Sequence, residues 1–205
     1  MEPCERDLVE RIESMEVGER SSRSAKTIDL LRRFLSVQQR RAEAYAKLRR
    51  GFTDYMSNGG ELVYQQLCNE ITMEFNECSK QVLEMESLLM MSDVCREDLA
   101  SLLKAVQAQE KQKLHLTARI QILKKAGRPS ERLLNHSSCQ FKSPTQYACG
   151  HVHEIAKAAG TEDAEADVEY DSALKEAIRG VQDTVTSIND HLEEVHYEIE
   201  ALESE

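Results

Sequence analysis

The sequence has few of the residues that build β-sheet cores or interrupt helices. It contains no tryptophan, aromatic residues make up 5% of its 205 residues, and only three prolines occur. Sandwiches and barrels need strands rich in β-branched and aromatic residues, so this composition is typical of a helical protein. Because the prolines stand at positions 3, 129 and 144, the stretches 4–128 and 145–205 are free of the strongest helix breaker.

Two further absences concern the location of the protein. No run of residues is long and apolar enough to span a bilayer, so no membrane association is expected. The first twenty residues lack a basic segment followed by an apolar one, and no secretory signal is predicted. Six cysteines without such a signal favour a reducing, intracellular setting.

Four segments carry apolar residues at alternating steps of three and four, which is the spacing of helices that pack through one face. Three of these helices are expected within residues 25–126 and the fourth within 172–205. The fourth stripe is apolar at every position, so this helix is expected to pack on a partner helix. Its members are Leu174, Ile178, Val181, Val185, Ile188, Leu192, Val195, Ile199 and Leu202.

Polar residues and cysteines also stand on the stripes. The first stripe comprises Ile28, Leu31, Leu35, Gln38, Ala42, Tyr45, Arg49, Phe52 and Met56, and the third contains Gln109 and Lys113. Polar residues at such positions more often set helix register than bind a ligand. Three cysteines on the stripes are expected to pack in the core as small apolar side chains, namely Cys68, Cys78 and Cys95.

Glycines and phase shifts mark the ends of the predicted helices. Asn58-Gly59-Gly60 can adopt positive φ and stop the first helix, and Gly127, followed by a proline at 129, can stop the third. After residue 89 the apolar pattern restarts out of phase, which indicates either a turn or a stammer in one long helix. We favour a turn, because Ser92 or Asp93 can cap a new helix.

These features predict an all-α fold in which antiparallel helical hairpins with coiled-coil-like heptad stripes form an elongated bundle. The predicted first and third helices are basic and the second and fourth acidic, which favours their pairing. Residues 1–24 are expected to form an amphipathic segment and a linker. Residues 127–171, rich in polar residues and then acidic ones, are expected to be a long irregular insertion before the last helix, with residues 161–171 forming either a solvated acidic linker or the start of that helix.

A basic ridge repeats every seven residues on the first helix, at Lys26, Arg33, Arg40 and Lys47. Spaced lysine and arginine side chains can contact nucleic-acid phosphates. The alternative is a solvated helix face that pairs with an acidic neighbour, and the net charge of −11 favours that alternative. Any contact with DNA is therefore expected to be weak.

Histidines and cysteines cluster in the predicted insertion, at His136, Cys139, Cys149, His151 and His153. Such side chains can hold zinc, but their spacing matches no standard finger and includes no Cys-x-x-Cys pair. An ordinary polar loop is the favoured interpretation, and no cofactor is expected. The sequence also lacks a phosphate-binding glycine loop, a Gly-x-Ser-x-Gly elbow and a His-Glu-x-x-His pair, so no enzymatic activity is predicted.

Whole helices of the sequence resemble a known family. The runs LLRRFLSVQQRRAEAYAKLRRGFTDYMSNGG, YQQLCNEITMEFNECSKQVLEMESLL and LLKAVQAQEKQKLHLTARIQILKKAG are similar to the required-for-excision 1-B DNA-repair family. The final helix, ALKEAIRGVQDTVTSINDHLEEVHYEIEALE, looks like that family's last helix. The resemblance covers residues 28–126 and 172–203 and includes no catalytic motif.

The resemblance implies a non-enzymatic accessory protein of DNA excision repair, located in the nucleus, and an additional cytoplasmic location is left open. It would act by helix-mediated contact with proteins of a repair complex, and a homodimer through the last helix is an open alternative. A structural coiled-coil adaptor of a cytoskeletal or trafficking assembly fits the stripes as well. A metal-dependent helical enzyme would require the histidine and cysteine loop to bind a metal.

Overall fold

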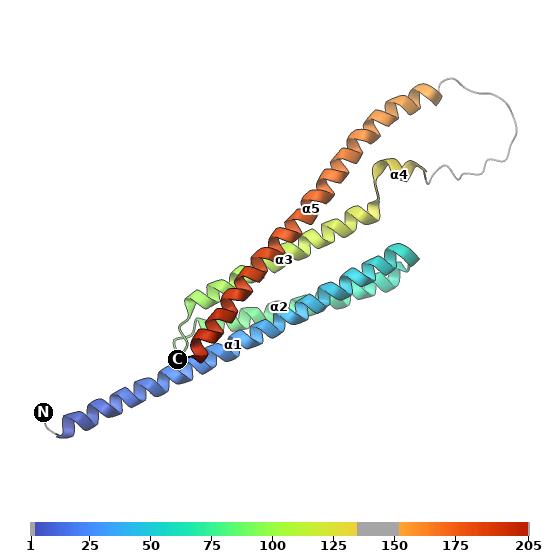
Figure 1. Ribbon diagram of the computed structural model, residues 1–205. Helices are drawn as coiled ribbons and strands as arrows, with labels where there is room; N and C mark the ends of the chain where they lie inside the picture. Colours follow the sequence, from blue (N-terminus) through green and yellow to red (C-terminus); the bar gives the residue numbers. More distant parts are fainter. Residues whose placement is uncertain (1–2, 135–151, 205) are drawn as a thin grey trace. The chain divides into compact units, whose positions relative to one another are not determined.

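A computed structural model describes residues 3–134 and 152–204, and these residues are almost entirely helical. The helices are α1 (Pro3–Asn58), α2 (Glu61–Leu89), α3 (Glu97–Ala126), the short α4 (Pro129–Leu134) and α5 (Val152–Glu203) (Figure 1). The described residues contain no strand. The prediction of an all-α, bundle-like fold is therefore confirmed.

The helices end where the sequence contains residues that tolerate positive φ. Gly59 and Gly60 follow the end of α1 with φ of 76° and 88°, and Gly127 follows the end of α3 with φ of 70°. An L side chain is disfavoured in this conformation, whereas glycine adopts it without a steric cost. The predicted ends of the first and third helices are confirmed.

A turn, and not a stammer, separates α2 from α3. The N–H of Arg96 donates to the carbonyl of Leu89 (2.8 Å) and the N–H of Cys95 donates to the carbonyl of Met91 (2.7 Å), which closes the turn. Helix α3 begins only at Glu97, so neither Ser92 nor Asp93 caps it as predicted.

Two helices extend further than predicted. Helix α1 continues through residues 18–24, where a linker was expected. Helix α5 includes residues 152–160, where an insertion was expected, and residues 161–171, for which the start of the last helix was one of two predicted alternatives. Both stretches lack proline and contain many charged and small residues that a helix accommodates. Residues 135–151 of the predicted insertion lie outside the described residues.

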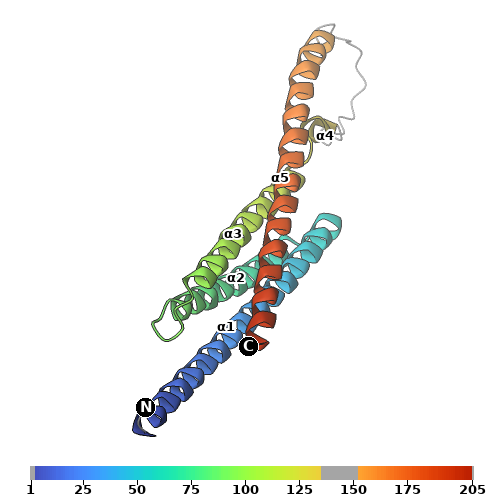
Figure 2. The same cartoon turned by 60° about the vertical axis from the view of Figure 1, so that its left-hand side comes forward.

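The chain divides into two compact units, the first formed by residues 1–110 with 186–205. In this unit α1 and α2 form an antiparallel hairpin and lie side by side (Figures 1 and 2). One apolar cluster joins its four helices and the α2–α3 turn. Fully or nearly fully buried members include Leu31 and Phe34 of α1, Val82 and Met85 of α2, Leu103 and Val106 of α3, and Val195 of α5.

The buried face of α1 differs from the predicted stripe. Phe34, Ala44 and Leu48 are buried although they lie off that stripe, whereas Ala42 and Arg49 on the stripe are exposed. Helix α1 packs on more than one neighbour, so a broad face is buried. Because a straight α-helix turns once every 3.6 residues, this face also drifts from a strict heptad.

The second unit contains residues 111–185. Its α3 and α5 segments approach closely at Gly180, where an added Cβ would stand 2.8 Å from Cδ1 of Leu116. Ion pairs flank this contact, including Arg128 Nη2 to Asp171 Oδ2 at 2.6 Å. A polar contact also fixes the start of α4, because the N–H of Ser130 donates to Oδ1 of Asp167 (3.0 Å).

The stripe predicted for the last helix is buried unevenly. Ile188, Val195 and Ile199 are buried within the first unit, and Leu174, Val181, Leu192 and Leu202 are half-buried. Ile178 and Val185 remain 39% and 37% exposed, whereas the adjacent Ala177 and Thr184 are buried in their place. The buried face of α5 is therefore shifted by one residue in the second unit.

Candidate partner-binding groove

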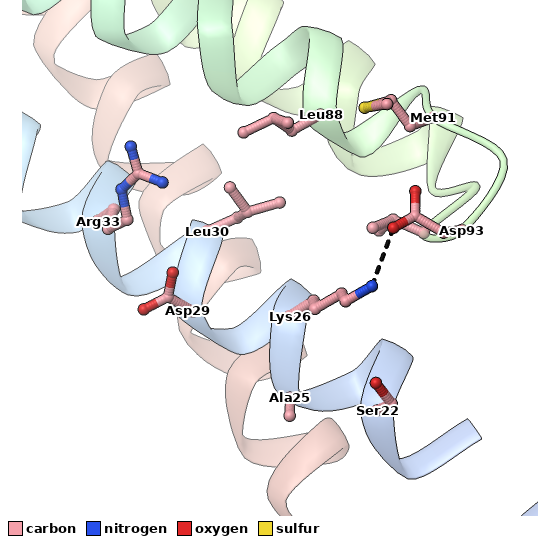
Figure 3. A pocket seen from close by; sticks show the side chains of 10 residues that line it. Ser22, Ala25, Lys26, Asp29, Leu30, Arg33, Leu88, Met91 and Asp93 are labelled. Atoms are coloured by element: carbon pink, nitrogen blue, oxygen red, sulfur yellow. Dashed lines mark hydrogen bonds and ion pairs between the residues drawn. The ribbon is translucent and has the colours of Figure 1, made fainter. Parts of the chain in front are cut away.

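An open groove of about 580 Å³ lies between α1 and the end of α2 with the turn that follows it (Figure 3). Helix α1 contributes the small side chains of Ser22 and Ala25, which leave space above the helix backbone. Leu30 of α1 and Leu88 of α2 face the same space from opposite sides (Figure 3). A volume of this size falls in the range of pockets that enclose a ligand or an anchoring side chain.

The floor of the groove is apolar. Leu30 and Val94 are only 5% and 8% exposed, because the groove sits directly over the core cluster. Met91 is 53% exposed and lines one wall. A flexible, polarisable thioether can adapt its shape to a bound apolar group.

Charged side chains border this floor. Nζ of Lys26 donates to Oδ2 of Asp93 at 2.9 Å, and this hydrogen bond holds the pKa of the Asp93 carboxyl below its usual value. Each of these side chains is about half exposed. Arg33 and Asp29 lie on the α1 wall, and Arg33 forms no ion pair within the described part of the chain. The groove thus combines an apolar floor with a cation that is available to a partner.

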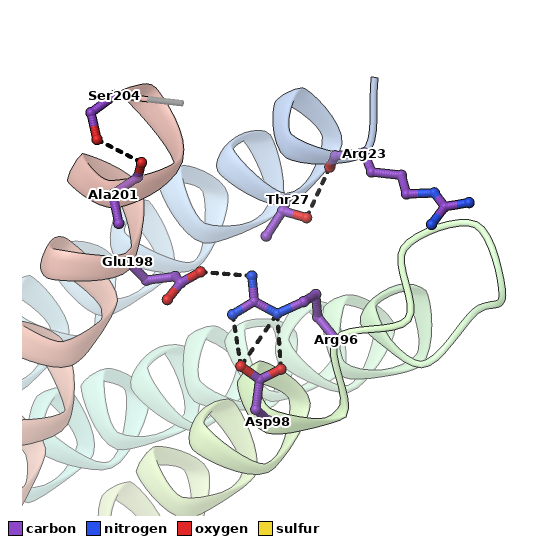
Figure 4. A network of polar contacts seen from close by, with 7 residues as sticks. All are labelled: Arg23, Thr27, Arg96, Asp98, Glu198, Ala201 and Ser204. Carbon is purple, nitrogen blue, oxygen red and sulfur yellow. Dashed lines mark hydrogen bonds and ion pairs between the residues drawn. The ribbon is translucent and has the colours of Figure 1, made fainter. Parts of the chain in front are cut away.

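A polar network holds the turn that forms the far wall (Figure 4). Arg96 binds the Asp98 carboxylate through two nitrogens, at 2.9 Å from Nε and 2.7 Å from Nη2, and it binds Glu198 of α5 at 2.6 Å. The Arg96 guanidinium lowers the pKa of Asp98, and the two carboxylates raise the pKa of Arg96. The network ties the α2–α3 turn to the last helix and keeps the groove wall in place.

The structure distributes the predicted basic ridge over different environments. Lys26 and Arg33 line the groove, while Lys47 is exposed elsewhere on α1. Arg40 turns toward α2, where it binds Glu74 (2.7 Å) and the side-chain carbonyl of Gln81 (3.1 Å). The hydrogen bond to Glu74 contributes most to raising the pKa of Arg40. The four side chains therefore do not form one continuous free basic surface.

The family comparison covers slightly less than half of the 205-residue chain. Residues 29–124 match the DNA repair REX1-B family. The match confirms the family resemblance predicted for residues 28–126 and supports a role related to DNA repair, whereas the resemblance predicted for residues 172–203 lies outside the match. The REX1-B match begins at Asp29 of the groove and includes α2 and nearly all of α3, whereas Lys26 precedes it. Neither the curated proteins nor the solved structures that were searched contain a match to this chain.

A buried polar cluster within the REX1-B region was not predicted from the sequence. Arg41 is 2% exposed and donates to Oγ of Ser79 (3.3 Å) and to the side-chain carbonyl of Gln107. Glu110, 6% exposed, attracts Arg41, and its backbone carbonyl accepts a hydrogen bond from Tyr45 (3.2 Å). Burial lowers the pKa of Arg41 and raises that of Tyr45. No periodic signal identified Arg41, because it lies off the predicted stripe.

The described residues contain no group of three histidine, cysteine or acidic side chains placed to hold a metal ion. The predicted metal candidates His136, Cys139, Cys149 and His151 lie outside the described residues, and His153 is placed only as part of the α5 backbone.

The cysteines on the stripes occupy different environments. Cys78 is buried, Cys68 is half-buried, and Cys95 is exposed in the turn with φ of 52°. The prediction of core packing was wrong for Cys95, because the turn carries this residue away from the helix face. Among the residues that the structure describes, no helix combines the length and the apolar character needed to cross a membrane.

Proposed function

We propose that this protein is a non-enzymatic accessory factor of DNA excision repair that holds partner proteins through its helical surfaces. The groove between α1 and the α2–α3 turn is the observation that carries the proposal. It combines an apolar floor with the exposed side chain of Met91 and with charged side chains at its edge. It lies beside the core of a helical bundle, and residues 29–124 of this chain match a DNA-repair family. Protein interfaces commonly combine such an apolar centre with a polar rim.

The setting of the charged residues supports a binding role over a catalytic one. Groups with displaced pKa values mark active sites in many enzymes, although structural ion pairs displace pKa values as well. Here Arg96 binds Glu198 of α5, and Arg40 of α1 binds Glu74 of α2. These contacts connect helices, which is what a binding scaffold needs.

Protein contact is favoured over DNA contact as the main activity. Two of the four ridge residues, Lys26 and Arg40, are engaged by carboxylates of the same chain. Exposed pairs of this kind are individually weak, but they reduce the charge available to phosphates. The family match suggests work in the nucleus, and we place the protein there, with a cytoplasmic pool.

Affinity capture of the full-length protein from cells, before and after ultraviolet damage, tests this function. We expect excision-repair proteins to be enriched, and we expect cells that lack the protein to remove ultraviolet lesions more slowly. Re-expression of the wild-type chain should restore removal. Capture of cytoskeletal or trafficking proteins regardless of damage, together with normal lesion removal, would instead support the structural-adaptor alternative.

A further inference from the structure

We infer that one face of the second unit binds the same face of a second copy of this chain, so that two pairs of α3 and α5 segments form a four-helix bundle. In this arrangement the basic α3 segment of each copy lies on the acidic α5 segment of the other. The face belongs to residues 111–185. The inference goes beyond the proposed function and does not depend on it.

The α3 and α5 segments of the second unit form a preformed layer of two helices. They approach closely where Leu116 meets Gly180, and Arg119 binds Glu176 at 3.8 Å. Beyond the end of α3, Arg128 binds Asp171 at 2.6 Å. Later residues of α3 thus meet earlier residues of α5, so the two segments run antiparallel.

An apolar stripe along α5 remains partly open to water in this layer. Its members are Leu174, Ile178, Val181 and Val185. They share one side of the helix because they are spaced by four, three and four residues. Ile178 and Val185 are exposed, and the other two are half-buried.

The same stripe is covered in the first unit. Ile188, Val195 and Ile199 continue it and are buried, because helices α1, α2 and α3 join α5 in one apolar cluster there. In the part of the second unit that the structure describes, only α3 and the short α4 accompany α5. Two helices leave one side of such a stripe exposed to water, whereas a four-helix bundle encloses it.

The charged residues along this face have opposite signs on the two helices. On α3 they are the lysines that share the side of Ile120 at helical spacing, Lys113 and Lys124, and no carboxylate occurs between residues 111 and 126. On α5 the stripe is preceded at the same spacing by three carboxylates, those of Asp163, Asp167 and Asp171.

The ion pair between Arg128 and Asp171 places these two rows on the same side of the helix pair. Arg128 follows Lys124 by four residues, and Asp171 precedes Leu174 by three. The face therefore has a basic row along α3, an acidic row along α5 and apolar side chains on both helices.

This separation of charge favours a second copy as the occupant. A partner helix with one sign of charge is attracted to one row and repelled by the other. A second copy presents both signs on two adjacent helices. A two-fold axis parallel to the helices brings α3 of each copy onto α5 of the other, so that basic and acidic rows meet in both contacts and the apolar stripes face one another.

Sedimentation velocity of the full-length protein over a range of concentrations tests the inference. We expect a dimer whose fraction rises with concentration, and a monomer at every concentration up to about 100 μM overturns the inference. Ile178→Asp should raise the dimer dissociation constant at least about tenfold, because it buries a carboxylate among apolar side chains.

Ile122→Asp is the matched control for Ile178→Asp. Ile122 is 68% exposed and follows Ile120 by two residues, so it lies on the opposite side of α3 from the proposed interface. Its replacement should leave the dissociation constant unchanged. Equal weakening by the two variants, or weakening by neither, overturns the inference.

Charge reversal tests which helices meet across the interface. Lys113→Glu with Lys124→Glu makes the α3 row acidic, and Asp163→Lys with Asp171→Lys makes the α5 row basic. Each of these double variants presents rows of one sign and should remain monomeric by itself. An equal mixture of the two should form a heterodimer, because every reversed row then meets a row of the opposite sign.

Circular dichroism of each variant controls for correct folding. If both double variants keep the helicity of the wild type, a mixture that stays monomeric overturns the inference, as does dimerisation of either variant alone to the wild-type extent. If charge reversal lowers the helicity, the comparison of Ile178→Asp with Ile122→Asp decides, because each of these variants changes one side chain only. Selective weakening by Ile178→Asp is the result that we expect.

Discussion

Gly51 of α1 lies so close to Leu67 of α2 that a Cβ added to the glycine would overlap Cδ2 of the leucine. The two residues belong to the hairpin that the Gly59-Gly60 turn closes, near the stacked rings of Tyr55 and Tyr64. The absence of a side chain at residue 51 therefore permits the close approach of the two helices.

Gly51→Val should lower the free energy of unfolding by about 1–3 kcal/mol, because the branched side chain forces the helices apart or Leu67 out of its rotamer. Chemical denaturation followed by circular dichroism measures this change. Adding Leu67→Ala to the same chain should recover part of the loss, because it frees the space that valine needs. Strictly additive effects would show that the two residues do not compete for space.

Gln38→Leu should stabilise the protein by about 1–2 kcal/mol. Gln38 is 7% exposed, and both atoms of its amide lack a hydrogen-bond partner among the described residues. Leucine removes the cost of burying these polar atoms and keeps a similar volume. Gln39→Leu, at an exposed neighbour, is the control and should change stability by less than about 0.5 kcal/mol in thermal unfolding.

Arg96 and Glu198 should show a coupling free energy of about 1 kcal/mol in a double-mutant cycle with glutamine replacements. Their side chains are only 25% and 28% exposed, so water screens the pair incompletely. The pair Arg32 and Glu203 also joins α5 to another helix but is 64% and 44% exposed. Its coupling should be near zero, and equal coupling in both cycles would refute the role of burial.

Glu86→Gln should stabilise the protein more as the pH rises. Burial raises the pKa of the Glu86 carboxyl in the folded state, although Lys104 opposes this effect. A carboxyl with a raised folded pKa binds more protons when folded than when unfolded, so stability falls as the pH rises from the unfolded pKa through the folded pKa. Glutamine removes that loss.

Denaturation at about pH 3 and about pH 7 measures the effect of Glu86→Gln. We expect no difference from wild type at the lower pH and a gain of about 0.5 kcal/mol at the higher one, since solvent still screens this partly exposed group. Glu84→Gln, at an exposed position of the same helix, is the matched control. A gain of equal size at both pH values would mean that the charge of Glu86 is not the cause.

Sequence periodicity identified the buried positions of α2 better than those of α1. The stripe predicted on α2 comprises Tyr64, Cys68, Ile71, Phe75, Cys78, Val82, Met85 and Leu89. Its six members from Ile71 onward are buried, and Tyr64 and Cys68 are half-buried. On α1 the same reasoning missed Phe34 and Leu48 and included the exposed Ala42. A heptad describes a narrow contact seam, whereas α1 buries a broader face that includes Phe34, Ala44 and Leu48.

The candidate groove could be anticipated only in part. Lys26 and Arg33 were identified as basic residues at heptad spacing, but their place beside Val94 and Met91 depends on how the α2–α3 turn folds back toward α1. Arg40, with the same spacing, meets Glu74 instead. Spacing along one helix cannot show which positions a neighbouring helix will cover.

Local interactions in the sequence determined that the chain is helical and that α1, α2 and α3 are separated by turns, because helix propensity, glycine and the phase of the apolar pattern act over a few residues. The tertiary structure decided which face of each helix is buried, which charges are paired and which side chains border the groove between α1 and the α2–α3 turn. These properties depend on side chains far apart in the sequence, and only packing brings them together.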